Sequence, residues 1–146
     1  MTRLFTLVLL AGICTFVSCK KTAVMSGGSW TVNSTSYTAS TCNGNSGIQA
    51  ITSDGTMLRV IFSSNPTTSG TYNVVSYWGS FPVSGQVCIW SSTSSTFLYG
   101  STGGGMVSVS VSNGTITVSG AGIPMAQASG YAAGNSVGPL TFSEYY

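Results

Sequence analysis

The segment that most constrains the fold runs from Met106 to Gly120 and reads MVSVSVSNGTITVSG. Aliphatic residues alternate with serine and threonine on both sides of the pair Asn113-Gly114. Such alternation is typical of β-strands that have one dry face and one wet face. Asn-Gly suits a two-residue type I′ turn, because both central residues of that turn need φ > 0. The segment therefore predicts a β-hairpin in which Val111 lies opposite Ile116, with the hydroxyl groups on the other face.

Short segments of the same kind recur along the chain between turn residues. Residues 30–39 predict a hairpin around Asn33-Ser34 with Trp30 opposite Tyr37, and residues 48–62 predict another around Asp54-Gly55. Its faces are expected to carry Ile51, Leu58, Val60 and Phe62 on one side and Ala50, Met57, Arg59 and Ile61 on the other. Further strands are expected at 71–75, 86–90, 96–101, 123–128 and 140–144, and loops at 41–47, 63–70, 76–85, 103–105 and 129–138. About nine short strands predict an all-β fold, a single antiparallel β-sandwich over residues 29–146.

The charge content excludes several classes of function. The 146 residues include four Lys or Arg, two Asp or Glu and no His, whereas a typical soluble domain is about one quarter charged. Without a basic stripe, nucleic-acid binding is not expected. Asp54 and Glu144 are the only carboxylate side chains, which leaves no ligand set for a metal and only one conceivable acid pair for glycoside hydrolysis. Serine hydrolysis would lack a base, so we expect no enzyme, no catalytic residue and no cofactor.

The N-terminus has the pattern of an export signal. Arg3 precedes an apolar run from Leu4 to Val17, which is too short for a membrane span of about 20 residues. The run ends in Ser18-Cys19-Lys20-Lys21, and this junction resembles a bacterial lipoprotein signal, although Phe16 stands where leucine is usual. The resemblance implies a signal peptide over 1–18, lipidation of Cys19 and a tether over 19–28. The alternative is an ordinary secretory signal cut further along the chain, near Ala23.

The mature chain resembles small Bacteroidota-type lipoproteins that have a single β-sandwich. The resemblance rests on the Ser-Cys-Lys-Lys junction, the Trp-Thr-Val-Asn opening at 30–33, Ser-Gly-Thr-Tyr at 69–72 and the Asn-Gly hairpin. It implies a bacterial cell-envelope location, at the outer membrane through the lipid anchor, and it implies no particular activity. If the chain is not lipidated, we expect it to be extracellular.

Two cysteines remain beyond the signal and the lipidation site. In an exported chain, the pair Cys42 and Cys88 favours a disulfide, which would contribute about 4 kcal/mol in the chain-entropy description. The alternative is two buried thiols, since an unbridged cysteine packs like a small hydrophobic residue.

Aromatic residues are the candidates for ligand contact. Tyr77, Trp78 and Phe81 stand in the expected loop 76–85 among glycine and serine, and rings beside hydroxyl groups suit sugars. The alternative is structural: Trp30, Trp90 and Phe97 in the core, and Trp78 capping an end of the sandwich.

Three functions remain in view. The first is a lipid-anchored, non-enzymatic envelope protein with a structural or interaction role. The second is a module that binds glycan or another polymer through the loop aromatics. The third is a subunit of a surface fibre, in which copies of the chain assemble by strand addition at an exposed sheet edge.

Overall fold

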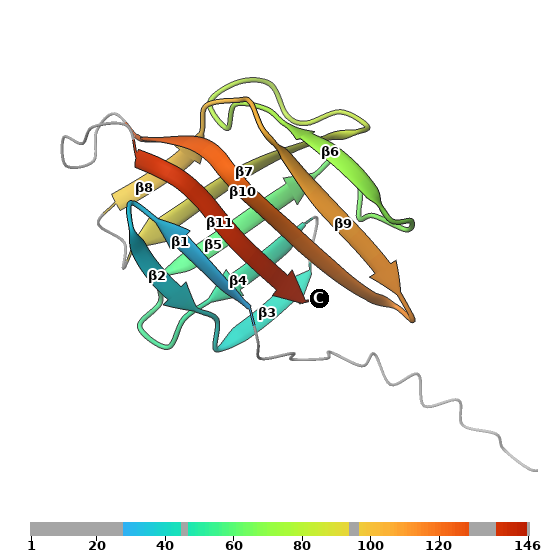
Figure 1. Cartoon of the computed structure of the whole chain (residues 1–146), viewed down its shortest axis with the longest axis horizontal. Coiled ribbons are helices and arrows are strands. Elements are labelled where there is room, and N and C mark those ends of the chain that lie inside the picture. The colour runs from blue at the N-terminus through green and yellow to red at the C-terminus, as the bar shows by residue number, and fades with distance from the viewer. Residues whose placement is uncertain (1–27, 45–46, 94–96, 129–136, 146) are drawn as a thin grey trace, which may run out of the picture.

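Eleven strands and no helix make up the part of the chain that the computed structural model describes, residues 28–44, 47–93, 97–128 and 137–145 (Figure 1). The strands are β1 (Ser29–Val32), β2 (Thr35–Thr38), β3 (Thr41–Gly44), β4 (Ile48–Ile51), β5 (Met57–Phe62), β6 (Gly70–Val74), β7 (Gln86–Thr93), β8 (Phe97–Ser101), β9 (Met106–Ser112), β10 (Thr115–Gln127) and β11 (Val137–Tyr145). The predicted all-β class is confirmed, with two strands more than the nine expected.

The strands form two layers whose directions cross in Figure 1. The front layer has the order β2-β1-β11-β10-β9-β6, and the back layer has the order β8-β7-β5-β4-β3. Pairing continues from one layer to the other at two seams. At one seam β6 pairs with β7, and at the other β8 pairs with β10. The molecule is therefore a β-sandwich, antiparallel as predicted except at the β6–β7 seam, which is parallel.

The hairpin of β9 and β10 has the predicted register. Val111 is the partner of Ile116 and Ser112 is the partner of Thr115. Asn113 and Gly114 have φ of 50° and 76°, the left-handed values that a type I′ turn requires. Val107 and Val109 are buried, Val111 is partly buried, and the serines that alternate with them are exposed. This hairpin therefore gives the front layer a hydroxyl-lined outer face.

The first hairpin is also confirmed. Trp30 is the partner of Tyr37, and their rings stack with centroids 5.5 Å apart. Asn33 and Ser34 both have positive φ, at 49° and 63°. Serine therefore occupies a turn position that glycine would fill more easily.

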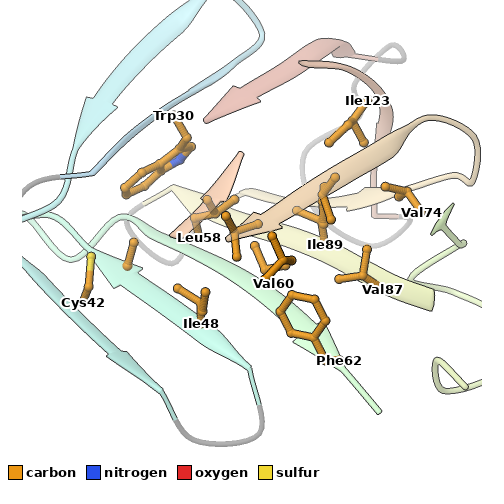
Figure 2. Packing of buried hydrophobic residues seen from close by; sticks show 14 of the residues in the cluster. Trp30, Cys42, Ile48, Leu58, Val60, Phe62, Val74, Val87, Ile89 and Ile123 are labelled. Atoms are coloured by element: carbon orange, nitrogen blue, oxygen red, sulfur yellow. The ribbon is translucent and has the colours of Figure 1, made fainter. Parts of the chain in front are cut away.

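The core lies between the two layers, where Figure 2 shows Trp30 and Leu58 among the buried side chains. Its largest members with almost no exposed surface are Trp30, Phe62, Leu58, Ile89, Ile123 and Met125. The Trp30 indole also has its polar atom satisfied, because Nε1 donates a hydrogen bond to Oγ of buried Ser91 at 3.3 Å. Ser91 in turn donates to the carbonyl of Met57 at 2.9 Å, which connects the first hairpin to the back layer.

Two details of the predicted strands were wrong. Residues 41–44, expected in a loop, form the edge strand β3 and pair with β4. In the second hairpin Ile51 pairs with Met57, so Ile51 shares the outer face of the sheet and Ala50 the inner face, the reverse of the expectation. The reason is the turn: the amide of Thr52 donates to the carbonyl of Thr56, which closes a five-residue connection one residue away from the assumed register.

Candidate aromatic binding site

The loop between β6 and β7, residues 75–85, is held to the sandwich where it begins. The amide of Val75 donates to Val87 and the amide of Tyr77 donates to Ser101, each at 2.8 Å. Fully buried Ser101 adds two side-chain bonds, because its Oγ donates to the Val75 carbonyl at 2.7 Å and accepts from the Ile89 amide at 3.1 Å. In the sequence Ser101 looks like any other serine of this chain, so its position could not be predicted. The start of the loop is thus fixed beside β8.

Two of the three predicted ligand-contact residues lie together. The rings of Tyr77 and Trp78 meet edge to face with centroids 4.8 Å apart. Trp90 on β7 joins them, with its ring 6.3 Å from that of Tyr77. Because Trp90 is partly exposed on the outer face of the back layer, its expected place in the core was wrong. Tyr77, Trp78 and Trp90 are called the aromatic patch below.

The aromatic patch keeps one ring open to solvent. Trp78 is 47% exposed, while Trp30 is 1% exposed. Phe81 is 64% exposed and makes no ring contact with the other aromatic residues that the structure describes. The structure therefore assembles Tyr77 and Trp78 into one surface and leaves Phe81 as a separate exposed ring. The side chain of Phe97 lies outside the described part.

Gly100 on β8 makes room for the two loop rings. A Cβ at this position would lie 2.8 Å from Cζ2 of Trp78 and 2.8 Å from Cδ1 of Tyr77, closer than real Cβ contacts. A glycine within a strand often marks the close approach of another group, which is the signal that could have pointed to Gly100. The rings rest on bare backbone, so their position depends on the absence of a side chain at Gly100.

The aromatic patch offers ring faces for contact with a ligand. An aromatic face carries partial negative charge and attracts the positively polarised C–H groups of a sugar ring. No group of three or more His, Cys, Asp or Glu that could hold a metal occurs among the described residues.

Asp54 lies in the β4–β5 turn, distant in sequence from the aromatic patch. Its carboxylate accepts hydrogen bonds from Thr52 Oγ1 and the Thr56 amide. These bonds lower the pKa of the Asp54 carboxyl, and the bond from Thr52 has the largest effect. Such a shift is expected for a turn residue.

A polar hollow is bordered by the end of the same loop. It has a volume of about 290 Å³, and its lining is mainly hydroxyl groups from the β5–β6 connection. Ser84 and Gly85 at the end of the β6–β7 loop complete it. Two polar side chains of its lining accept hydrogen bonds from the backbone of neighbouring segments. Asn65 Oδ1 accepts from the Gly47 amide, and Ser69 Oγ accepts from the Val111 amide. The hollow was not anticipated from sequence, where this segment looks like an ordinary loop.

The expected disulfide is absent: Cys42 and Cys88 are buried and unbridged. The successive strand pairings β3–β4, β4–β5 and β5–β7 align Cys42 on β3 with Ser91 on β7. Three strand spacings amount to about 14 Å, twice the largest Cα separation of a disulfide. Cys88 also lies an odd number of residues from Ser91, so it faces the opposite side of the sheet. Burial raises the pKa of the Cys88 thiol.

The lipidation site Cys19, the signal peptide over 1–18 and nearly all of the tether lie outside the described residues. Within the described part, no helix is long and apolar enough to cross a membrane. No protein-family model matches the chain, and no significant match to a curated protein or to a solved structure was found.

Proposed function

We propose that this chain is a non-enzymatic, lipid-anchored interaction protein of the cell envelope and that the aromatic patch is its glycan-binding surface. The observation that carries the proposal is the position of Trp78. This large ring remains half exposed, yet it is held between Tyr77 and the backbone of Gly100. A rigid exposed ring binds at low entropic cost, because its conformation is already set before the ligand arrives.

The remaining parts of the proposal rest on the sequence. Export and anchoring are supported by the Ser18-Cys19 junction after a short apolar run. A diacylglycerol together with an amide-linked acyl chain anchors a protein stably, whereas a single chain does so only marginally. The absence of histidine from the whole chain and the engagement of Asp54 in its turn support a binding role over an enzymatic one.

Assembly into a fibre by strand addition receives less support. In the described part of the chain the strand order ends at β2 and β3, which have four residues each. Very short edge strands are one of the devices that limit edge-to-edge association. We therefore place glycan binding ahead of self-assembly.

The test is retention in native gels that contain a soluble polysaccharide, with a β-glucan, a galactomannan and methyl-esterified polygalacturonate as probes. Wild-type protein should be retarded by at least one of these polymers. Trp78→Ala should lose the retardation while its melting temperature stays close to that of the wild type. Met106→Ala is the matched control, because Met106 is also an exposed apolar residue, at 59%, but stands on β9. Equal retardation of wild type and Trp78→Ala would contradict the proposal.

The anchor is tested separately by the intact mass of protein extracted from its native membrane. A chain beginning at Cys19 and carrying three acyl chains is expected. An unmodified chain that begins beyond Cys19 would replace the lipid anchor with secretion.

A further inference from the structure

A row of side chains continues from the aromatic patch across the outer face of the back layer. Gly100 is the partner of Trp90, Trp90 of Arg59, Arg59 of Gln49, and Gln49 of Asn43. Directly opposite residues of an antiparallel pair lie on the same face of the sheet. These five residues are called the Trp90 row, and they connect the two loop rings on Gly100 to the edge strand β3.

The Trp90 row is accessible along its length beyond Gly100. Trp90, Arg59 and Gln49 are partly exposed, and Asn43 on the edge strand is exposed. The neighbouring row has a different character, since Met57 and Ile51 lie beside it on the same face. A line of polar hydrogen-bonding groups therefore crosses a partly apolar surface and begins at an aromatic platform.

The order of groups along the row suits an extended chain molecule. Four strand spacings from Gly100 to Asn43 amount to about 19 Å, which is long enough for several linked sugar units. Aromatic rings come first, a guanidinium follows, and two amides come last. Amides and guanidinium groups offer the donors and acceptors that sugar hydroxyl and carboxylate groups need.

Arg59 gives the row a positive charge. It is the only Lys or Arg among the described residues, and it stands one strand away from Trp90. Guanidinium groups bind carboxylates with two parallel hydrogen bonds, which neutral sugars cannot match. Arg59 places a positive charge between the ring of Trp90 and the amide of Gln49, and this charge is complementary to a chain that carries negative charge.

We propose that the Trp90 row is an extended subsite for an acidic polysaccharide, in which the carboxylate of a uronic acid binds Arg59 while a neighbouring sugar stacks on Trp78. This inference rests on the proposed glycan binding and adds the class of glycan. It also assigns Gln49 and Asn43 to the far end of the subsite.

The experiment compares polygalacturonate with its methyl-esterified form, which has the same backbone without the charge. Wild-type protein should bind the acid form more tightly. Arg59→Gln should weaken binding of the acid form by about tenfold or more and leave binding of the ester unchanged. Arg59→Lys, which keeps the charge but loses the planar fork, should fall between the two. Ser110→Gln on the exposed face of β9 is the control, and each variant's melting curve checks that it is folded.

A second measurement varies the salt concentration. Binding of polygalacturonate should weaken as salt is raised from 0.05 to 0.5 M, whereas binding of the ester should not. The salt dependence should be smaller in Arg59→Gln than in wild type, because one positive charge is lost. Part of it should remain, since Lys20 and Lys21 also carry charge.

The outcomes separate the two proposals. If Trp78→Ala abolishes binding of both polymers while Arg59→Gln changes neither, the acidic subsite is overturned and glycan binding stands. If wild type binds neither polymer, the acidic subsite is overturned, and glycan binding stands only if a β-glucan or a galactomannan retards the protein. If Trp78→Ala changes nothing, both proposals are overturned. If Arg59→Gln alters only the sedimentation coefficient of the free protein, the face is an interface between copies, and the acidic subsite is again overturned.

Discussion

Two Trp–Tyr pairs in the described part of the chain place their tryptophans in opposite environments. Trp30 and Tyr37 stack across the first hairpin at 5.5 Å, and Trp30 is 1% exposed. Tyr77 and Trp78 meet edge to face at 4.8 Å in the β6–β7 loop, and Trp78 is 47% exposed. The residue types are the same and the ring separations are similar. The difference in burial comes entirely from the elements that carry the pairs.

The backbone around each pair explains the difference. Trp30 lies on a strand whose inward face is completed by the opposite layer, where Ser91 accepts the hydrogen bond of the indole. Trp78 lies in a loop that has already left the space between the layers and turned onto the outer face, where it rests on Gly100. An aromatic pair stabilises the fold when it has a second layer against it, and it offers a surface for binding when it has only one.

The largest expected effect is that of removing the buried ring. Trp30→Ala should lower the free energy of unfolding by about 3–5 kcal/mol, because it leaves a cavity and removes the indole hydrogen bond to Ser91. Trp78→Ala should cost about 1 kcal/mol or less. Denaturant unfolding of both variants measures the difference. Similar losses for the two variants would mean that Trp78 is a structural residue and would remove the contrast between the pairs.

An intermediate effect is expected from filling the space beneath the exposed pair. Gly100→Ala places a methyl group 2.8 Å from both rings, so the rings must move outward. We expect a stability loss of about 1–2 kcal/mol together with loss of polysaccharide retention. Tryptophan fluorescence and native gels follow the two effects. Unchanged retention would show that binding does not require the rings to rest on Gly100.

The smallest effect concerns the ionisation of Tyr37, which is partly buried beside Trp30. Burial raises the pKa of the Tyr37 phenol above its ordinary value, so the folded chain holds this proton more tightly than the unfolded chain. The stabilising contribution is complete below the unfolded pKa, near 10, and is lost as the pH rises through the folded pKa. Wild-type stability should therefore decline more steeply between pH 9 and 11 than that of Tyr37→Phe, as measured by urea unfolding. Parallel declines would contradict this assignment.

Much of the fold could be predicted because its signals are local. In the β9–β10 hairpin, the alternation from Met106 and the Asn113-Gly114 turn fix both the faces and the register. The β4–β5 register could not be read in the same way, because the hydrogen bonds of Thr52 and Asp54 lengthen the turn by an amount that composition does not reveal. The disulfide prediction failed for a related reason. Cysteine parity says nothing about which face each residue takes, and Cys42 and Cys88 are on opposite faces.

The candidate site was predicted only in part. The loop sequence pointed to Tyr77 and Trp78, since aromatic residues among glycine and serine stand out from the alternating strands. Trp90 and Arg59 lie 31 residues apart in the chain, and only the β5–β7 pairing makes them neighbours. No local pattern carries that information.

By itself, the sequence determined the all-β class and the hydroxyl-lined face of β9 and β10. These follow from composition and from a two-residue period, which act within a few residues of one another. Tertiary structure alone decided that Gly100 lies beneath Trp78, that Arg59 stands beside Trp90 and that the two cysteines remain apart. Those relations depend on strand order and register between segments distant in the chain, which are set when the two layers close over one core.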